Sequence, residues 1–207
     1  DFAPVLDIYS NPKNTVIGNR SFGTTAEIVS NMGISLAKGL ENTGIIPVYK
    51  HFPGHGDTLE DSHTTLPIIN KTKEELMDME LKPFIEAVEN DAEIIMVSHL
   101  AVPKITGNNT PATLSKEIIT DLLKEELGFD GIVITDALNM KALTNKYTEE
   151  EIYINAINAG VDILLMPDFD IETINIIKQA ITSAEISEEQ IDKSVSKILD
   201  LKYDLLE

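Results

Sequence analysis

The chain has 207 residues with 16 Lys and Arg against 35 Asp and Glu, and its formal charge of −19 argues against a nucleic-acid partner, because phosphate binding relies on clustered cations. Apolar residues make up 43% and charged residues 25% of the sequence, which is typical of a globular domain with a buried core and not of a disordered or coiled-coil chain. The absence of Cys excludes disulfides and thiolate metal sites, and no apolar run approaches the roughly 20 residues that cross a bilayer.

Short apolar segments alternate along the chain with longer segments whose apolar residues are spaced by three and four, as in amphipathic helices. The chain begins inside an apolar segment and without Met, so we expect an upstream piece to be missing. Thr72 and Ser115 occupy expected N-cap positions, and three Gly residues stand at the expected C-terminal ends of helices, where they act as stop signals. In chain order, the expected strands are 2–8, 46–52, 94–100, 131–138 and 162–167, the expected helices are 26–42, 73–90, 115–127, 149–159, 171–184 and 187–205, and the stops are Gly44, Gly128 and Gly160.

This alternation predicts an α/β fold with parallel strands covered on both faces. A doubly wound nucleotide fold usually carries a Gly-rich turn after its first strand, and this sequence has neither GxGxxG nor GxxxxGK. Polar side chains instead follow several different strands, which is typical of a barrel. We therefore expect a (β/α) TIM-type barrel, incomplete in this chain with about five of the usual eight βα units.

The densest polar stretch runs from Lys50 to Pro67 and holds three of the four His residues. His51 and His55 are four apart, like the ligands of a zinc helix, but a Pro-Gly pair between them would break that helix. We expect neither a metal nor a cofactor. We interpret His55 and Asp57 as polar residues that tie down a loop through local hydrogen bonds.

Two further groups suit catalysis. A carboxylate such as Asp61, two residues from His63 on a loop, can accept a hydrogen bond from the imidazole Nδ1–H and leave Nε2 free to exchange protons with a substrate. Asp136 ends a very apolar strand and is either the cap of a following helix or a nucleophile or base. Arg20 follows the first strand and either forms a surface ion pair or donates several hydrogen bonds from its planar guanidinium to a ligand.

These residues carry a resemblance to a known family. The stretch from Lys50 to Pro67 resembles the signature of glycoside hydrolase family 3, and its Asp-Ser-His at 61–63 resembles the loop of the β-N-acetylglucosaminidase branch. The resemblance covers essentially the whole chain and extends through Phe2 to Ile8, Ile17-Gly18-Asn19-Arg20-Ser21-Phe22-Gly23, Ser98-His99, Thr110-Pro111-Ala112-Thr113-Leu114-Ser115 and Gly131 to Met140.

The resemblance implies a retaining exo-β-N-acetylglucosaminidase, with residues 1–207 as the C-terminal part of a single catalytic (β/α) barrel. It implies that Asp136 is the nucleophile and that His63, oriented by Asp61, is the general acid/base. The carbohydrate substrate is the implied partner, with no metal and no cofactor. The implied sugar-binding residues are Arg20, Lys50 and His51, with Asp7 nearby and His99 lining the pocket.

The sequence departs from the family at its beginning, because the upstream acidic loop that clasps the terminal sugar in family members has no counterpart here. Five strands would leave open edges, so we expect either an upstream segment or self-association to complete the barrel. Two alternatives stay open. A neutral His63 does not repel phosphate, so a phosphorylase is compatible with the motifs; an inactive fragment that serves as an assembly module is the other.

Overall fold

The computed structural model describes residues 1–58, 62, 65–168 and 170–204, so the predicted pair Asp61 and His63 lies outside the described residues. None of the described helices is both long and apolar enough to cross a membrane. The described elements in chain order are η1 (Gly18–Arg20), α1 (Ala26–Glu41), β1 (Val48–Phe52), α2 (Lys73–Asp78), α3 (Lys82–Glu89), β2 (Ile94–Val97), α4 (Pro103–Thr106), η2 (Ala112–Leu114), η3 (Glu117–Glu126), β3 (Ile132–Thr135), α5 (Lys141–Thr144), α6 (Glu149–Ala159), α7 (Ile171–Thr182) and α8 (Glu188–Asp204).

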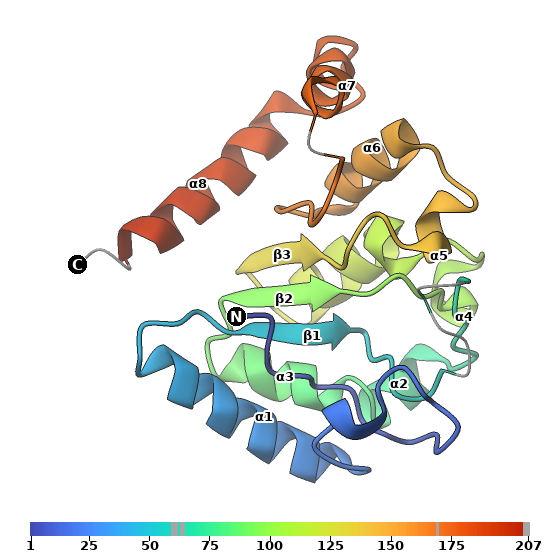
Figure 1. The fold of residues 1–207 in the computed structure, drawn as a ribbon, viewed down its shortest axis with the longest axis vertical. Coiled ribbons are helices and arrows are strands. Elements are labelled where there is room, and N and C mark those ends of the chain that lie inside the picture. The colour runs from blue at the N-terminus through green and yellow to red at the C-terminus, as the bar shows by residue number, and fades with distance from the viewer. Residues whose placement is uncertain (59–61, 63–64, 169, 205–207) are drawn as a thin grey trace.

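The strands form a parallel three-stranded sheet in the order β1-β2-β3 (Figure 1). We call the face that packs against the helices of the main core the outer face, and the opposite face the inner face. The first and last predicted strands are not regular strands in the structure. Each forms one isolated bridge, Val5 to Lys50 and Ile134 to Ile163, with a few backbone hydrogen bonds beside it. Pro4 has no N–H to offer a ladder. On the other side, the Asp162 carboxylate accepts from the Val133 N–H at 2.9 Å and so replaces a strand carbonyl.

The alternation of side chains along the sheet separates two apolar layers. Outward residues of the three strands belong to the main core beneath the helices, while the inward residues Val48, Met96 and Ile134 form a second cluster. Ile163 and Leu165 pack against this inner cluster from the segment that follows α6. The inner face of the sheet is therefore apolar at these positions.

The predicted helices are present, with two differences in detail. The expected helix 73–90 is divided into α2 and α3 at Met79, whose backbone has φ −140° and ψ −76°, and α3 starts with Pro83 in its first turn. The segment 117–126 is wound as a π-helix, and the Ser115 hydroxyl donates to the Glu117 carboxylate instead of capping a backbone N–H. The predicted cap at Thr72 is confirmed as a capping box with Glu75.

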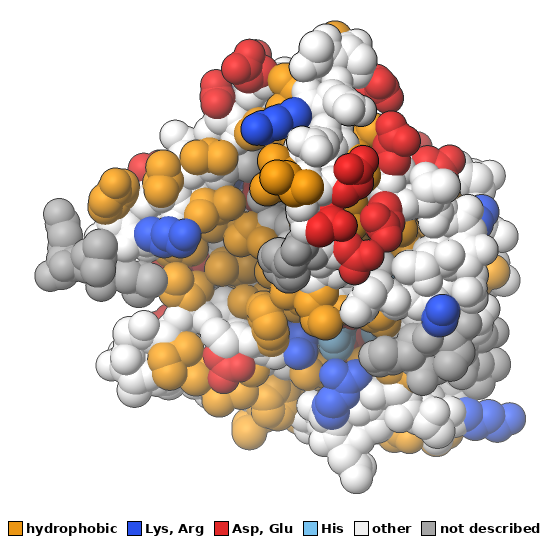
Figure 2. Space-filling view, turned by 45° about the horizontal axis from the view of Figure 1, so that its top comes forward, with side chains coloured by type: hydrophobic (Ala, Val, Ile, Leu, Met, Phe, Trp, Pro, Cys, Tyr) orange, Lys and Arg blue, Asp and Glu red, His pale blue; other side chains and the backbone are white. Residues whose placement is uncertain are grey.

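Two helices at opposite flanks of the sheet carry apolar stripes that face solvent. On α1 the stripe consists of Ile28, Met32 and Leu36, between 40% and 51% exposed. On α8 it consists of Val195, Leu199 and Tyr203, between 43% and 64% exposed. Figure 2 shows how hydrophobic side chains also line the hollow between α8 and the rest of the molecule. The fold thus presents exposed apolar surface at both flanks of the sheet, on α1 and on α8.

Candidate active site

A cavity of about 350 Å³ opens at the carboxyl ends of β1 and β3. In parallel α/β folds this is the end at which functional side chains converge. A larger cavity of about 560 Å³ lies at the opposite ends of β2 and β3, but its lining lacks the His and Arg side chains of the first. We place the candidate site in the smaller cavity, which is lined by Phe2, Val16, Arg20, Lys50, His51, His55, Ser62, Met96, Asp136, Ala137, Leu165 and Met166.

Strand alternation explains why Lys50 and Asp136 enter this cavity. Lys50 follows the inward residue Val48 by two positions, and Asp136 follows the inward residue Ile134 by two positions. Residues two apart on a strand point to the same face. The two charged side chains therefore cap the apolar inner layer at the same end of the sheet.

Asp136 is held as a carboxylate. Burial acts to raise its pKa, but the neighbouring His51 and His99, the Ala137 N–H and Lys50 outweigh burial and hold the pKa below its usual value. The Ala137 N–H donates to Asp136 Oδ1 at 2.8 Å. The alternative of a helix cap is wrong, because the next helix, α5, begins only at Lys141 after Met140. Asp136 thus presents a partly buried anion to the cavity.

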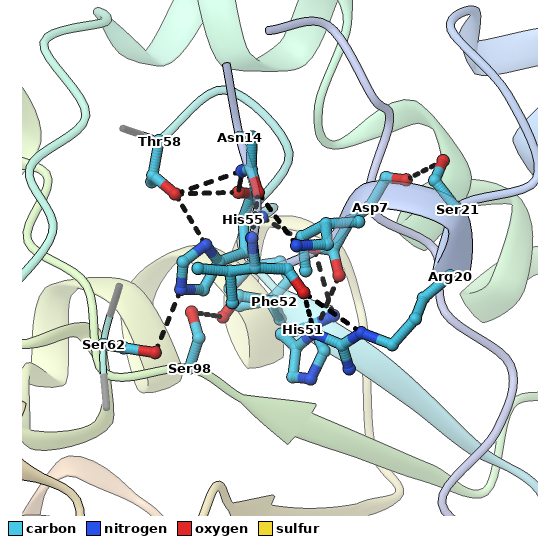
Figure 3. Close-up of polar contacts among 12 residues, drawn as sticks. Asp7, Asn14, Arg20, Ser21, His51, Phe52, His55, Thr58, Ser62 and Ser98 are labelled. Atoms are coloured by element: carbon cyan, nitrogen blue, oxygen red, sulfur yellow. Dashed lines mark hydrogen bonds and ion pairs between the residues drawn. The ribbon is translucent and has the colours of Figure 1, made fainter. Parts of the chain in front are cut away.

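Two features set the direction of the His51 side chain, a register shift in the strand pairing and a buried carboxylate. The register between β1 and β2 shifts between Lys50 and Phe52, and such bulges redirect a side chain. His51 Nδ1 lies 2.6 Å from Asp7 Oδ2, and the His51 N–H donates to Asp7 Oδ1 at 3.3 Å (Figure 3). A carboxylate on Nδ1 directs the ring's Nε2 away from Asp7.

Asp7 is fully buried and is not among the residues that line the cavity. Burial acts to raise its pKa, but His51 and His55 outweigh burial and keep the pKa below the usual value. Its carboxylate also accepts from the His55 N–H at 2.6 Å. The structure therefore places Asp7 behind the cavity wall, where it holds two residues that do line the cavity.

Lys50 and Arg20 bring positive charge to the cavity. Burial and the Arg20 charge lower the pKa of Lys50, and Asp136 and Asp7 act in the opposite direction. Arg20 ends η1, and its Nε and Nη2 donate to the Val16 carbonyl at 3.2 and 2.8 Å. Arg20 and His51 both line the cavity, and Figure 3 shows both side chains. These contacts fix the plane of the guanidinium at the mouth of the cavity.

His99 lies behind Asp136 and not among the lining residues. Its Nε2 is 2.9 Å from the Ala137 carbonyl and its Nδ1 is 2.7 Å from Thr113 Oγ1. Burial lowers its pKa, although Asp136 acts to raise it. His99 therefore contacts the backbone that carries Asp136 and is not among the residues that line this cavity, whereas the resemblance implied that it lines the pocket.

The loop after β1 supplies two cavity residues that the sequence did not single out for the site. Gly56 passes so close to the first segment that a Cβ would lie 1.8 Å from the Ile8 carbonyl oxygen, so only Gly fits. His55 and Ser62, both 2% exposed, are joined through Nε2 and Oγ at 3.2 Å. The interpretation of His55 as a loop tie agrees with this bond, and Asp57 ties the loop to Lys71 at 2.9 Å.

The acidic and imidazole side chains of the site do not form a metal centre in the described part of the chain, where no group of three or more potential ligands is arranged around one point. The assigned acid/base pair, Asp61 and His63, flanks Ser62 in the sequence. Their roles stay predictions, since their positions are outside the described residues.

Comparisons with known proteins agree with one another. The family model described as glycosyl hydrolase family 3 N terminal domain matches residues 1–201. The chain is 35% identical to beta-hexosaminidase A of Pseudoalteromonas piscicida over 99% of the chain and 38% of that protein, and 36% identical to beta-hexosaminidase LpqI of Mycobacterium bovis over 98% and 53%. It is 42% identical to the structure of a glycoside hydrolase family 3 beta-N-acetylglucosaminidase from Paenibacillus sp. str. FPU-7, with a TM-score of 0.95 over 99% of the chain and 40% of that structure.

Proposed function

The chain belongs to glycosyl hydrolase family 3, and from that premise we propose that it is part of a retaining exo-β-N-acetylglucosaminidase. The observation that carries the proposal is the Asp136 carboxylate, which faces a cavity together with Lys50, Arg20 and His51 at the carboxyl end of a parallel sheet. The proposed substrate is a terminal β-linked N-acetylhexosamine of an oligosaccharide, glycoconjugate or cell-wall fragment.

Asp136 is the proposed nucleophile. Its lowered pKa keeps the carboxylate ionised at neutral pH, so that an oxygen attacks the anomeric carbon while the bond to the leaving oxygen breaks. The Ala137 N–H and the neighbouring charges orient the carboxylate before substrate binds. The product of this first step is a glycosyl ester on Asp136, and attack by water on the same carbon from the other side regenerates the carboxylate with net retention.

His63 is the proposed general acid/base and Asp61 its orienting partner. In the first step the imidazole gives a proton to the leaving oxygen, and in the second it takes a proton from the attacking water. An imidazole is neutral when its proton has left, so an incoming phosphate is not repelled as it would be by a carboxylate. Both water and phosphate are therefore compatible with this group as the acceptor of the sugar, and the assay with inorganic phosphate distinguishes them.

Lys50, His51 and Arg20 are the proposed donors to the hydroxyls of the terminal sugar. All three line the cavity with Asp136, and Asp7 holds His51 from behind. Asp7 holds the His51 ring and the Val16 carbonyl holds the Arg20 guanidinium, so these two donors bind sugar oxygens at little cost in ordering. We assign Asp7 and His99 to the support of His51 and Asp136 and not to sugar contact.

The open apolar faces support a larger barrel. The chain spans between 38% and 53% of the length of the two curated relatives described above. The inner apolar cluster and the stripes on α1 and α8 lie where additional βα units would pack in a closed barrel. We propose that residues 1–207 are one part of a single catalytic barrel that further βα units of the same protein complete.

The decisive experiment is an assay of the complete gene product with a chromogenic β-N-acetylglucosaminide. We expect release of N-acetylglucosamine, and NMR of the first product should detect the β-anomer because the mechanism retains configuration. Parallel reactions with inorganic phosphate distinguish a hydrolase from a phosphorylase, which would yield the sugar 1-phosphate. An α-anomer as the first product, or no cleavage, would contradict the proposal.

A further inference from the structure

Asn14 is a buried residue of the segment before η1, and it is not among the residues that line the candidate site. Its side chain is 2% exposed, and Figure 3 shows it between the first segment and the loop after β1. The side-chain oxygen Oδ1 accepts from the N–H groups of Val16 and Ile17 at 3.0 and 2.8 Å. The side-chain nitrogen Nδ2 donates to the His55 carbonyl at 2.7 Å and to Thr58 Oγ1 at 3.3 Å. Asn14 therefore joins two segments that are far apart in the sequence.

The peptide group between Val16 and Ile17 connects Asn14 to Arg20. Its N–H belongs to Ile17 and donates to Asn14 Oδ1, while its C=O belongs to Val16 and accepts from Arg20 Nε and Nη2 at 3.2 and 2.8 Å. A peptide group is planar, and in the trans form its N–H and C=O point in opposite directions. The hydrogen bond to Asn14 therefore fixes the plane of the same carbonyl that holds the Arg20 guanidinium.

The direction of this carbonyl matters for Arg20 because the guanidinium is a rigid plane with five N–H donors. The Val16 carbonyl accepts from two of its nitrogens and so sets the direction of the whole plane. Arg20 lines the cavity together with Lys50 and His51. A long side chain that is ordered before a ligand arrives loses less conformational freedom on binding. The readiness of Arg20 to bind a sugar therefore depends on a peptide group that Asn14 holds.

The other end of the Asn14 side chain is connected to the His51 side of the cavity. His55, whose carbonyl accepts from Asn14, donates its own N–H to Asp7 Oδ1 at 2.6 Å. Asp7 Oδ2 in turn lies 2.6 Å from His51 Nδ1. A continuous series of hydrogen bonds thus leads from Arg20 through Asn14 to His51. Asn14 is the residue of this series that links the Arg20 segment to the loop after β1.

From these contacts, and resting on the proposed function, we propose that Asn14 is a positioning residue that acts through Arg20 on the binding of the terminal sugar. A side-chain amide offers two N–H donors and an oxygen with two lone pairs. The four hydrogen bonds of Asn14 use all of them. Asn14 itself makes no contact with the sugar, because it stands behind the cavity wall.

The test is a double-mutant cycle in the complete gene product, with Asn14→Ala and Arg20→Ala measured singly and together. Asn14→Ala alone should lower kcat/KM for a chromogenic β-N-acetylglucosaminide about tenfold, but less than about twofold when Arg20 is already replaced. A merely structural role would cause the same loss in both backgrounds. Equal losses, or full activity of Asn14→Ala, would therefore overturn the proposal.

Asn158→Ala is the matched control for the cycle. Asn158 also donates from Nδ2 to a backbone carbonyl, that of Glu185 at 3.0 Å, but it is exposed and is not among the residues that line the cavity. This variant should match the wild type in kcat/KM. Asn14→Ser keeps a side-chain oxygen that accepts from the backbone two residues on, so it should recover part of the lost activity. It replaces Asn14→Ala in the cycle if the Ala variant does not fold.

A crystal structure of the Asn14 variant supplies a readout that does not require turnover. We expect the Arg20 guanidinium to leave the Val16 carbonyl, while the His51 ring stays on Asp7. An Arg20 side chain in its original position would overturn the positioning role, whatever the activity of the variant. An inactive wild type would refute the proposed glycosidase, and the position of Arg20 in the variant would still decide the role of Asn14.

Discussion

His51 Nδ1 lies 2.6 Å from Asp7 Oδ2, although 44 positions separate the two residues in the sequence. The same buried carboxylate accepts from the His51 and His55 backbone N–H groups, so it organises both ends of the turn after β1. A carboxylate is the group that fits three donors, because it has only acceptor sites. The orientation of the cavity wall therefore depends on a side chain that does not reach the cavity.

Replacing Asp7 with Asn should damage this arrangement. An amide points N–H groups at donors, and a buried donor without an acceptor costs about 1–3 kcal/mol. We expect a loss of about 2 kcal/mol or more in the free energy of unfolding and about a hundredfold loss in kcat/KM, measured by urea titration and initial rates. Asp121→Asn, which alters an exposed pair with Lys116, is the control and should cost less than about 1 kcal/mol. Equal effects of the two variants would contradict this role of Asp7.

Asp136→Asn should abolish turnover and leave the fold intact. Asn cannot form the glycosyl ester, so kcat should fall by about a thousandfold or more, while circular dichroism and Tm stay close to wild type. A fluoroglycoside that traps the intermediate should label Asp136, as peptide mass spectrometry would detect. Label on Asp61 would reverse the assignment of roles.

His63→Ala should show a strong dependence on the leaving group. Protonation matters least when the aglycone leaves as a stable anion, so the first step should be nearly normal for dinitrophenyl glycosides and slow for natural substrates. A series of aryl glycosides with graded leaving-group pKa values measures this dependence. A uniform loss across the series would instead identify His63 as a residue that binds substrate or organises the loop.

Stability should fall as the pH drops from about 7 to about 5, the region around the ordinary His pKa. Burial lowers the pKa of His55 and of His99, so the unfolded chain binds protons there before the folded chain does. The free energy of unfolding then rises with pH, by at most about 1.4 kcal/mol per pH unit for each His. Urea titrations across this range measure the slope, and His55→Asn should reduce it. A slope of zero in the wild type would contradict the lowered pKa values.

Lys71 should contribute strongly to stability through Glu80. The Lys71 ammonium binds both Glu80 and Asp57. The Glu80 side chain is only 1% exposed, and its Oε2 has no hydrogen-bond partner among the residues that the structure describes. Lys71→Met would leave a buried carboxylate without its cation, at a cost of about 3 kcal/mol. Adding Glu80→Gln removes that charge and should recover part of the loss. If the double variant is no more stable than Lys71→Met, the buried charge is not the cause.

The sequence by itself determined the elements whose signals are local. Apolar spacing by three and four identified α1, α6, α7 and α8, and the capping box at Thr72 is complete within four residues. The sequence also showed polar side chains at the ends of apolar strands, and Lys50 and Asp136 of this set line the cavity. These signals survive because neighbouring residues in a helix or strand have fixed relative directions. The family resemblance was also local, because it came from short motifs such as Lys50 to Pro67 and Gly131 to Met140, and the family model that matches residues 1–201 confirms it.

Only the tertiary structure decided which distant side chains meet. Asp7 pairs with His51, and His99 sits behind Asp136 and not in the cavity, contacts that depend on how separate loops approach one another. It also reduced the first and last predicted strands to single bridges, because Pro4 lacks an N–H and Asp162 takes the place of a backbone acceptor. Such outcomes depend on long-range hydrogen bonds between segments far apart in the chain. Periodicity within one segment contains no information about them.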